Sequence, residues 1–395
     1  MQKKSLRDIN VASKKVLTRV DFNVPMDEEK GIITNENRII EALPTIKYLL
    51  SNNAKVILCS HLGRPKGEPN PKYSLAPVAK RLSEHIGKPV TMAPDCIGPE
   101  TKAIVDAMKD GDVVLLENLR FHEEEEKNVP EFAKELADLA EIYCDDAFGT
   151  AHRKHASIVG VTKYLPSVCG FLLDKEIKTL GSILDEPKQP FGVMLGGAKV
   201  EDKVALIENI VNKVDRIIIG GGMAATFLKA KGYEVGASLL DTNIEQATYL
   251  LDLAKMHKVE VVLPVDVVVT EVGTNEAAIR NVKIDAIPQD MRIVDMGTAT
   301  IELFKSKLEP LATLFWNGPS GIYEIPAFST GTREMVKFVS EMKGQTIIGG
   351  GSTAEVVTNW GYAPKMSFVS TGGGASLKFL SGEVLPGLDA LDDME

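Results

Sequence analysis

Short, almost continuously apolar runs recur along the whole chain and alternate with stretches of helical spacing. Runs of this kind are typical of strands buried on both faces. They occupy residues 16–20, 56–59, 113–116, 142–144, 193–195, 217–219, 261–263, 314–316, 346–348 and 368–370. Between them, apolar residues three and four positions apart predict helices at 38–50, 75–86, 129–140, 200–211, 244–255 and 330–342. This alternation predicts an α/β protein with parallel sheets flanked by helices.

The two halves of the chain carry different residues after their strands. Polar and charged residues come after the strands of the first half, at 21–23, 60–64, 117–120 and 145–147. Glycine clusters come after those of the second half, at 196–197, 220–222, 349–351 and 372–374. Open parallel sheets bind ligands outside the carboxyl ends of their strands. Each half is therefore expected to carry its own site, the first built from side chains and the second from backbone.

A domain boundary is expected between Tyr164 and Pro190. An amphipathic stretch at 171–184 predicts a helix that joins the two domains, and the proline-containing segment 186–190 then breaks the pattern. The length of 395 residues agrees with two domains.

Composition excludes several classes of protein. The net charge of −10 argues against a surface that binds polyanions over its whole extent, although a local basic pocket is compatible with it. The sequence contains no apolar run long enough for a membrane span and no apolar signal core in residues 1–10, so a cytoplasmic protein is expected. Its four cysteines, Cys59, Cys96, Cys144 and Cys169, form no CxxC pair. Buried, reduced thiols are the expectation, with a disulfide or a zinc site as the alternative.

The first-half site is expected to hold a small molecule with more than one anionic group. Its candidate side chains are those of Asp21, Asn23, Arg38, His61, Arg64, Arg120, His152 and Arg153. Arginine presents a planar fork that suits phosphate and carboxylate, and Asp21 and Asn23 could accept from and donate to a hydroxyl. Each histidine could be a general acid or base, or a neutral hydrogen-bond donor. The competing interpretation is a set of surface salt bridges.

The second-half glycines would let backbone N–H groups approach an anion at helix N-termini. Residues 196–199 are predicted to run into a helix on which Lys199 and Lys203 share one face and neutralise phosphate charge. The sequence contains no GxxxxGK followed by Ser or Thr, and no GxGxxG after the first strand of this half. A P-loop enzyme and a dinucleotide-binding dehydrogenase are therefore not indicated.

At these positions the sequence resembles the phosphoglycerate kinase family over essentially its whole length. The matching segments are Arg19-Val-Asp-Phe-Asn-Val-Pro25, Ser60-His-Leu-Gly-Arg-Pro65, Glu117-Asn-Leu-Arg-Phe121, Asp146-Ala-Phe-Gly-Thr-Ala-His-Arg153, Leu195-Gly-Gly-Ala-Lys-Val200, Gly220-Gly-Gly-Met223, Trp316-Asn-Gly-Pro319 and Ser370-Thr-Gly-Gly-Gly-Ala375.

The resemblance implies two doubly wound, Rossmann-like domains joined by a helix hinge. Residues 1–168 would bind 3-phosphoglycerate or 1,3-bisphosphoglycerate, and residues 189–384 would bind ADP or ATP with Mg²⁺. Residues 169–188 would form the interdomain helix and hinge, and the tail at 385–395 would return to the first domain. The implied activity is direct in-line phosphoryl transfer from 1,3-bisphosphoglycerate to ADP after domain closure. The implied state is a cytoplasmic monomer without nucleic-acid or membrane partners.

The resemblance also assigns roles to individual residues. The glycerate substrate would be held by Asp21, Asn23, Arg38, His61, Leu62, Gly63, Arg64, Arg120 and Arg153. The phosphoryl group in transfer would meet Arg38, Lys199 and the backbone of Gly372 and Gly373. The nucleotide would be held by Lys203, Gly221, Gly297, Asn317, Glu324, Gly350, Gly351, Ser352 and Thr353.

One position departs from the family pattern. The family commonly has aspartate after the glycines at 349–351, near the magnesium ion, and here that residue is Ser352. Magnesium is often held by few carboxylates together with phosphates and water. Ser352 could therefore act through a water, the nucleotide could carry the ion, or Glu355 could substitute. A catalytically weak relative that binds nucleotide or a protein partner is the alternative, and the departure at Ser352 is its support.

Overall fold

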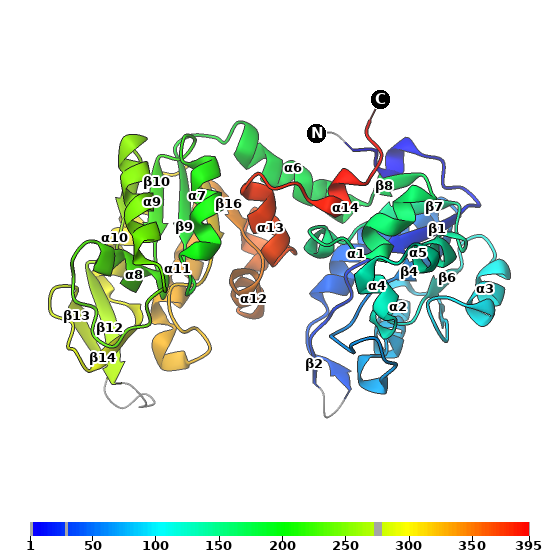
Figure 1. Ribbon diagram of the computed structural model, residues 1–395, viewed down its shortest axis with the longest axis horizontal. Helices are drawn as coiled ribbons and strands as arrows, with labels where there is room; N and C mark the ends of the chain where they lie inside the picture. The colour runs from blue at the N-terminus through cyan, green and yellow to red at the C-terminus, as the bar shows by residue number, and fades with distance from the viewer. Residues whose placement is uncertain (1–2, 28–30, 272–278, 395) are drawn as a thin grey trace. The chain divides into compact units, whose positions relative to one another are not determined.

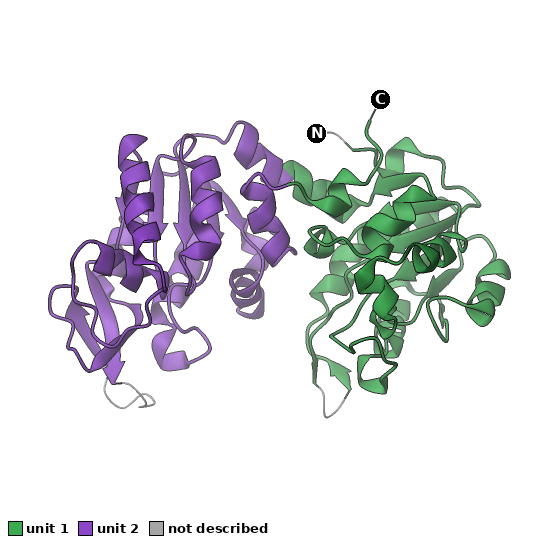
Figure 2. Cartoon of the chain, viewed as in Figure 1, with its two compact units in different colours: residues 1–178, 384–395 green, residues 179–383 purple. Residues whose placement is uncertain are grey.

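The computed structural model describes residues 3–27, 31–271 and 279–394, and the chain forms two compact units (Figure 2). Unit 1 comprises Met1–Lys178 with Val384–Glu395, and unit 2 comprises Thr179–Glu383. Helix α6 (Phe171–Asp185) contains the first crossing between the units. Each unit has its own six-stranded parallel sheet, which confirms the predicted fold class.

The sheet of unit 1 has the spatial order β5-β6-β4-β1-β7-β8 (Figure 1). Its strands are β1 (Lys15–Arg19), β4 (Lys55–Cys59), β5 (Val90–Met92), β6 (Val113–Leu115), β7 (Ile142–Asp145) and β8 (Ser167–Cys169). Arg19 pairs with Cys59 on one side and with Asp145 on the other, so β1, β4 and β7 end at the same level. The polar residues that come after these strands therefore lie at one edge of the sheet.

The helices of unit 1 are α1 (Asn37–Ser51), α2 (Ala76–Ile86), α3 (Pro99–Asp106), α4 (Glu123–Lys127), α5 (Pro130–Ala137) and α14 (Pro386–Asp389). Of these, α1 packs against β4 and α2 against β5. In α1 the buried residues Ile39, Ala42, Ile46 and Leu49 recur every three or four positions, and they join the core that contains Val56 of β4. Arg38 thus stands in the first turn of a helix that this core anchors.

The sheet of unit 2 has the order β11-β10-β9-β15-β16-β17. Its strands are β9 (Phe191–Leu195), β10 (Arg216–Ile219), β11 (Glu260–Val262), β15 (Thr313–Asn317), β16 (Gln345–Ile348) and β17 (Phe368–Val369). Its helices are α7 (Val204–Ile210), α8 (Met223–Ala230), α9 (Ile244–Met256), α10 (Thr298–Leu308), α11 (Thr330–Glu341), α12 (Ser352–Asn359) and α13 (Gly373–Leu380). The strand order reverses direction between β9 and β15, where a doubly wound sheet opens a crevice for ligands.

Two small antiparallel elements were not predicted. The strands β12 (Asp266–Glu271), β13 (Arg280–Lys283) and β14 (Met291–Met296) form a three-stranded sheet in unit 2, and β2 (Met26–Asp27) pairs with β3 (Ile32–Ile33) in unit 1. Residues of β13 are exposed or half-buried. A strand with little buried surface carries no apolar run, so the pattern that finds the parallel strands misses it.

The C-terminal segment packs within unit 1. Lys3 Nζ donates to the carbonyl of Leu391 at 2.8 Å, and the backbone N–H of Gly387 donates to the carbonyl of Ala151 at 2.8 Å. The N–H of Asp392 donates to the carbonyl of Ser167 in β8 at 3.0 Å. Within the described ranges, no helix combines the length and apolar character that crossing a bilayer requires.

Candidate active site

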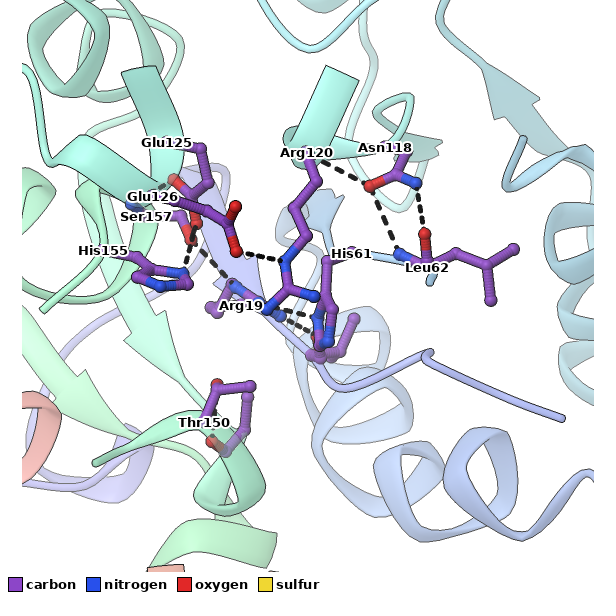
Figure 3. A network of polar contacts seen from close by, with 12 residues as sticks. Arg19, His61, Leu62, Asn118, Arg120, Glu125, Glu126, Thr150, His155 and Ser157 are labelled. Carbon is purple, nitrogen blue, oxygen red and sulfur yellow. Dashed lines mark hydrogen bonds and ion pairs between the residues drawn. The ribbon is translucent and has the colours of Figure 1, made fainter. Parts of the chain in front are cut away.

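The carboxyl edge of the unit 1 sheet holds a buried network centred on Arg19, the last residue of β1 (Figure 3). Arg19 is 1% exposed. Its Nε donates to Ser157 Oγ at 2.9 Å, its Nη1 donates to the carbonyl of Val20, and its Nη2 lies 3.1 Å from His61 Nδ1. Sequence reasoning placed Arg19 inside a strand and gave it no role. A charged residue at the end of an otherwise apolar run was the signal that could have identified it.

Arg19 determines which nitrogen of His61 carries the proton. A guanidinium can only donate hydrogen bonds, so Nδ1 of His61 must accept and the neutral ring carries its proton on Nε2. Burial lowers the pKa of His61 well below its usual value, and Arg19, Arg120 and Arg38 lower it further against the opposing effect of Asp21. Of the roles left open for His61, this geometry favours the neutral hydrogen-bond donor.

Asp21 and Arg38 form an ion pair between the loop after β1 and the first turn of α1. Burial alone would raise the pKa of Asp21, but the positive charges of Arg38 and Arg19 and the hydrogen bond from the Asn23 N–H lower it to about 2. Asp21 is therefore ionised throughout the physiological range. Asn23 Oδ1 accepts from the N–H of Gly63 at 2.8 Å, so it also orients the loop after β4.

The loop that contains Leu62 and Gly63 is fixed from both sides. Asn118 Oδ1 accepts from the N–H of Leu62 at 3.2 Å, and Asn118 Nδ2 donates to the carbonyl of Leu62 at 2.7 Å. Arg120, which is 6% exposed, donates to the carbonyl of Gly63 at 2.9 Å. Asn23, Leu62 and Gly63 line a pocket of about 200 Å³. Asn118 is a further residue that the sequence did not single out.

Arg64 and Arg153 carry positive charges that other residues of the described chain do not pair with. Arg64 is exposed and Arg153 half-exposed, and neither side chain forms a hydrogen bond or ion pair with another residue in the described part of the chain. Arg153 nevertheless lies close enough to contribute to the lowered pKa of Arg120, for which burial is the main cause. His152 stands beside Arg153 and is half-buried. Unpaired cations at this edge leave positive charge for an anionic ligand.

One carboxylate lies buried behind this basic edge. Glu125 of α4 is fully buried and accepts from Ser157 Oγ at 2.6 Å and from the Ser157 N–H at 2.9 Å. Because the Ser157 hydroxyl donates to Glu125, its oxygen is free to accept from Arg19. Burial raises the pKa of Glu125, while Arg19 lowers it. The series of hydrogen bonds Glu125–Ser157–Arg19–His61 therefore orients the imidazole through its Nδ1.

In unit 2, two helix N-termini meet at the carboxyl edge of the sheet. Helix α12 begins after Gly351 and α13 begins after Gly372. A Cβ on Gly350 would lie 2.4 Å from the nitrogen of Gly373, and Gly351 has a φ of +74°. Only glycine permits this approach and this backbone conformation. The two N-termini thus present adjacent N–H groups and the positive ends of two helix dipoles to an anion.

A cavity of about 410 Å³ opens beside β12 and β14 in the same unit. Backbone from Gly197, Gly220 and Gly221 lines one part of it, and apolar side chains such as Leu239, Val267 and Ile293 line another. Glu324, Tyr323 and Ser352 also line it. An apolar slot with glycine backbone and a few polar groups is the usual form of a small-molecule site and suits a nucleoside.

Several predicted nucleotide residues lie outside this cavity lining. Lys203 is 6% exposed and its Nζ donates to Asn317 Oδ1, and burial lowers its pKa to about 8. Gly297 is buried against Asp266, and Met296 lines the cavity in its place. Thr353 is buried and its Oγ1 accepts from the N–H of Gly318 at 2.6 Å. Gly350 and Gly351 belong to the two-helix edge described above.

The predicted shared helix face of Lys199 and Lys203 is wrong. Helix α7 begins at Val204, and Glu201–Lys203 form a 3₁₀ turn before it. Asp241 Oδ2 accepts from the N–H of Val200 at 2.8 Å and from that of Glu201 at 3.3 Å. Because Asp241 accepts from these two N–H groups, they are not available for the hydrogen bonds of an α-helix that begins earlier. The segment forms a 3₁₀ turn instead. Lys199 is left exposed before the turn, whereas Lys203 is buried.

The donors around Ser352 fit a magnesium ion held mainly by its nucleotide. Ser352 is the first residue of α12, and Glu355 lies one turn later; both are exposed. A hydroxyl and a carboxylate are hard oxygen ligands, and magnesium commonly keeps waters and substrate phosphates in the rest of its coordination shell.

An arginine-rich edge in one α/β unit and paired helix N-termini beside a nucleoside-sized cavity in the other define a nucleotide-dependent phosphotransferase. Comparison with known proteins gives the family. The sequence model of phosphoglycerate kinase matches residues 6–383, and the chain belongs to this family. Its reaction is the reversible phosphoryl transfer from 1,3-bisphosphoglycerate to ADP in glycolysis.

Curated relatives and solved structures agree with this assignment. The chain is 52% identical over 396 residues to phosphoglycerate kinase of Clostridium botulinum (strain Eklund 17B / Type B), covering 99% of both chains. It is 51% identical over 398 residues to that of Pelodictyon phaeoclathratiforme, covering 100% of both. The structure of the Coxiella burnetii enzyme matches with a TM-score of 0.86 and 39% identity over 98% of each chain. That of the Pyrococcus horikoshii OT3 enzyme matches with a TM-score of 0.82 and 33% identity over 98% of each.

Proposed function

We propose that the basic edge of unit 1 holds the glycerate substrate and that the helix N-termini and cavity of unit 2 hold the nucleotide. The observation that carries this division is the contrast between the two edges. One offers arginine and a histidine fixed as a donor, which suits carboxylate, hydroxyl and phosphate groups of a small acid. The other offers backbone N–H groups beside an apolar cavity, which suits phosphates and a base.

In unit 1, Arg64, Arg120 and Arg153 would neutralise the anionic groups of the substrate. His61 would donate from Nε2 to a substrate oxygen, since its Nδ1 is occupied by Arg19. Asp21 would accept from the substrate hydroxyl, which its ionised state permits, and Asn23 would keep the Gly63 backbone in place. Arg38 would exchange part of its contact with Asp21 for the phosphoryl group in transfer.

In unit 2, Gly350, Gly351, Gly372 and Gly373 would direct N–H groups at the nucleotide phosphates. Glu324 and Gly221 line the cavity and would meet the ribose and the base. Lys203, whose pKa near 8 still leaves it mostly charged at pH 7, would neutralise phosphate charge with Asn317 as its fixed partner. Lys199, exposed before the 3₁₀ turn, would be available to the migrating group.

The chemistry needs positioning and neutralised charge more than it needs a protein nucleophile. A terminal oxygen of ADP attacks the phosphorus of the acyl phosphate, and the carboxylate of 3-phosphoglycerate leaves. The attacking oxygen is already anionic, so no general base is required. Arg38 and Lys199 would offset charge on the equatorial oxygens, and magnesium, when bound with the nucleotide near Ser352, supplies further neutralisation.

Direct transfer also requires the two substrates to meet and water to be excluded, because an acyl phosphate would otherwise hydrolyse. We therefore propose a closing motion for which α6 supplies the hinge. Substitutions that stiffen α6 should lower turnover, and unchanged turnover would refute the hinge. A monomer acting in the cytoplasm completes the proposal and rests on the family resemblance.

Arg38→Ala tests the assignment. We expect turnover in ATP synthesis to fall by at least ~10²-fold, since a preorganised donor to the transition state is removed. Arg81→Ala is the matched control, because Arg81 pairs with Glu36 on the surface of unit 1. Near-parental turnover in Arg38→Ala, with the control also unchanged, would remove Arg38 from the catalytic role.

A further inference from the structure

Three different metal-binding side chains meet in unit 1, between the loop after β5 and the start of α4. They are the carboxylate of Asp95, the thiol of Cys96 and the imidazole of His122, and their ligand atoms all lie within 4.8 Å of one another. Residues 3–27, 31–271 and 279–394 contain no other group of three His, Cys, Asp or Glu side chains this close. The roles proposed above use none of the three.

The carboxylate of Asp95 lies close to both of the other ligand atoms. Its Oδ1 is 2.7 Å from His122 Nε2, and the Cys96 sulfur lies within 4.8 Å of this carboxylate. The N–H of Cys96 donates to the same Oδ1 at 2.6 Å. The hydrogen bond between His122 and Asp95 thus lies at the point where the three ligand atoms converge. A cation at that point could replace this hydrogen bond and also reach the sulfur.

Contacts outside the cluster also hold Asp95 and His122. Thr101 Oγ1 donates to the carbonyl of Asp95 at 2.9 Å and so ties the loop to α3. The His122 ring packs against Phe132 of α5, with ring centroids 5.4 Å apart. Because the ligands are held in position before any ion arrives, binding needs little reordering of side chains.

Burial leaves one side of the cluster open. Cys96 is fully buried, whereas the side chains of Asp95 and His122 are 43% and 24% exposed. An ion can therefore enter past Asp95 and His122, and a water can complete a fourth position. Three protein ligands with one water is a common zinc arrangement.

We propose that Asp95, Cys96 and His122 form a binding site for a divalent cation of the zinc class. Sulfur, imidazole nitrogen and one carboxylate oxygen favour zinc or cobalt over magnesium and calcium, which prefer oxygen alone. On binding, the Cys96 thiol proton leaves to solvent and the sulfur binds as thiolate. The hydrogen on His122 Nε2 is given up as well, so that the neutral ring carries its proton on Nδ1 and binds the ion through Nε2. A divalent ion with one thiolate and one carboxylate has no net charge, which suits a partly buried site.

Cobalt binding tests the proposal with a thiolate-specific signal. Nucleotide-free full-length chain, kept reduced and in excess Mg²⁺ to occupy hard-oxygen sites, is titrated with Co²⁺. We expect one equivalent to give a thiolate-to-cobalt charge-transfer band together with tetrahedral visible bands. Zn²⁺ should abolish both bands by displacing the cobalt. Zn²⁺ should also raise the melting temperature of the parent, because it binds the folded state.

Variants and matched controls localise the signal. Cys96→Ser should remove the charge-transfer band, and both Cys96→Ser and His122→Gln should weaken Zn²⁺ binding by at least ~10-fold. His85→Gln removes a similar histidine–carboxylate pair without cysteine, with His85 Nε2 2.8 Å from Glu36, and Cys169→Ser removes another buried thiol. Both controls should bind like the parent. Absence of the band in the parent, its persistence in Cys96→Ser, or equal loss in the controls would overturn the proposal. His122→Gln decides the case if Cys96→Ser does not fold.

Discussion

Replacing Arg19 by glutamine tests whether Arg19 keeps the His61 proton on Nε2 while the imidazole itself is retained. In the parent, the guanidinium donates to Nδ1 and keeps the proton on Nε2. The amide oxygen of glutamine can instead accept from Nδ1–H, which would move the proton and turn an Nε2 lone pair toward an anionic substrate. The substrate then loses one hydrogen bond that involves a charged group, worth about 1.5–3 kcal/mol. This corresponds to a roughly 10- to 100-fold rise in KM for 3-phosphoglycerate near pH 8.

The pH dependence distinguishes this reasoning from a general structural defect. Burial is the main cause of the low pKa of His61 and persists in the variant, but Arg19 is one of the charges that lower it further, so its removal raises that pKa above the parent's. Acid then protonates both ring nitrogens of His61 in the variant before it does so in the parent, and this restores an Nε2–H donor. We therefore expect the ratio of variant to parent KM to fall as the pH is lowered from 8 into the acid range. Using the ratio cancels the titration of the substrate phosphate, whose second pKa lies near 6.

Arg81→Gln is the control for loss of a positive charge in unit 1, since Arg81 pairs with Glu36 and Glu84 and bonds no residue of this network. Unchanged affinity for ADP with Mg²⁺ would show that unit 2 is intact in the Arg19→Gln variant. A KM ratio that is flat with pH, or that grows in acid, would refute the proposed fixing of the His61 proton.

Two further predictions concern buried or altered oxygen groups. Asp146 accepts from the N–H of Leu172 at 2.8 Å in the first turn of α6, and burial raises its pKa from 3.8 to about 7. Its folded-state pKa exceeds the unfolded value, so its contribution to stability is complete below pH 3.8 and is lost as the pH rises through about 7. Asp146→Asn keeps an acceptor oxygen and should therefore raise Tm at pH 8 by several degrees. Thermal melts of variant and parent should show this gain shrinking toward pH 4. A gain in Tm that is equal at every pH would contradict the assignment. Ser352→Asp should lower the Mg²⁺ concentration that gives half-maximal ATP synthesis at fixed ADP, because it adds a carboxylate at the start of α12. An unchanged Mg²⁺ concentration at half-maximal rate would mean that the nucleotide and other groups hold the ion.

Most of the buried parallel strands were predictable because each is a continuous apolar run, which is stable only when both of its faces are buried. The edge strands β5 and β8 were not, since Val-Thr-Met and Ser-Val-Cys mix polar with apolar residues. The same limit applies to β13 of the three-stranded sheet, which buries little surface, whereas β12 is mostly buried and its run Val267-Val268-Val269 was a signal that the sequence analysis missed. Periodicity reports burial, so strands that mix polar with apolar residues leave a weak pattern.

The candidate site was predictable as a set of charges but not as a network. Residues after strand ends share an edge of the sheet, which brought Asp21, His61 and Arg120 to attention. The supporting residues Glu125, Ser157 and Arg19 are distant in sequence and meet only in the fold. Local spacing also failed for Lys199 and Lys203, because the position of Asp241 determines where α7 begins. Contacts between distant segments have no signature in a single sequence.

The division of the two substrates between the two units is tested most directly by calorimetry on two variants. Arg64→Met removes an exposed arginine of unit 1 that has no described partner, and Lys203→Met removes the buried lysine beside Asn317 in unit 2. Each variant and the parent are titrated separately with 3-phosphoglycerate and with ADP and Mg²⁺. We expect Arg64→Met to weaken 3-phosphoglycerate binding by at least ~10-fold and to leave ADP unchanged, because one charge-assisted contact is lost. Lys203→Met should do the reverse, and a variant that weakens both ligands equally, or the ligand assigned to the other unit, would contradict the account.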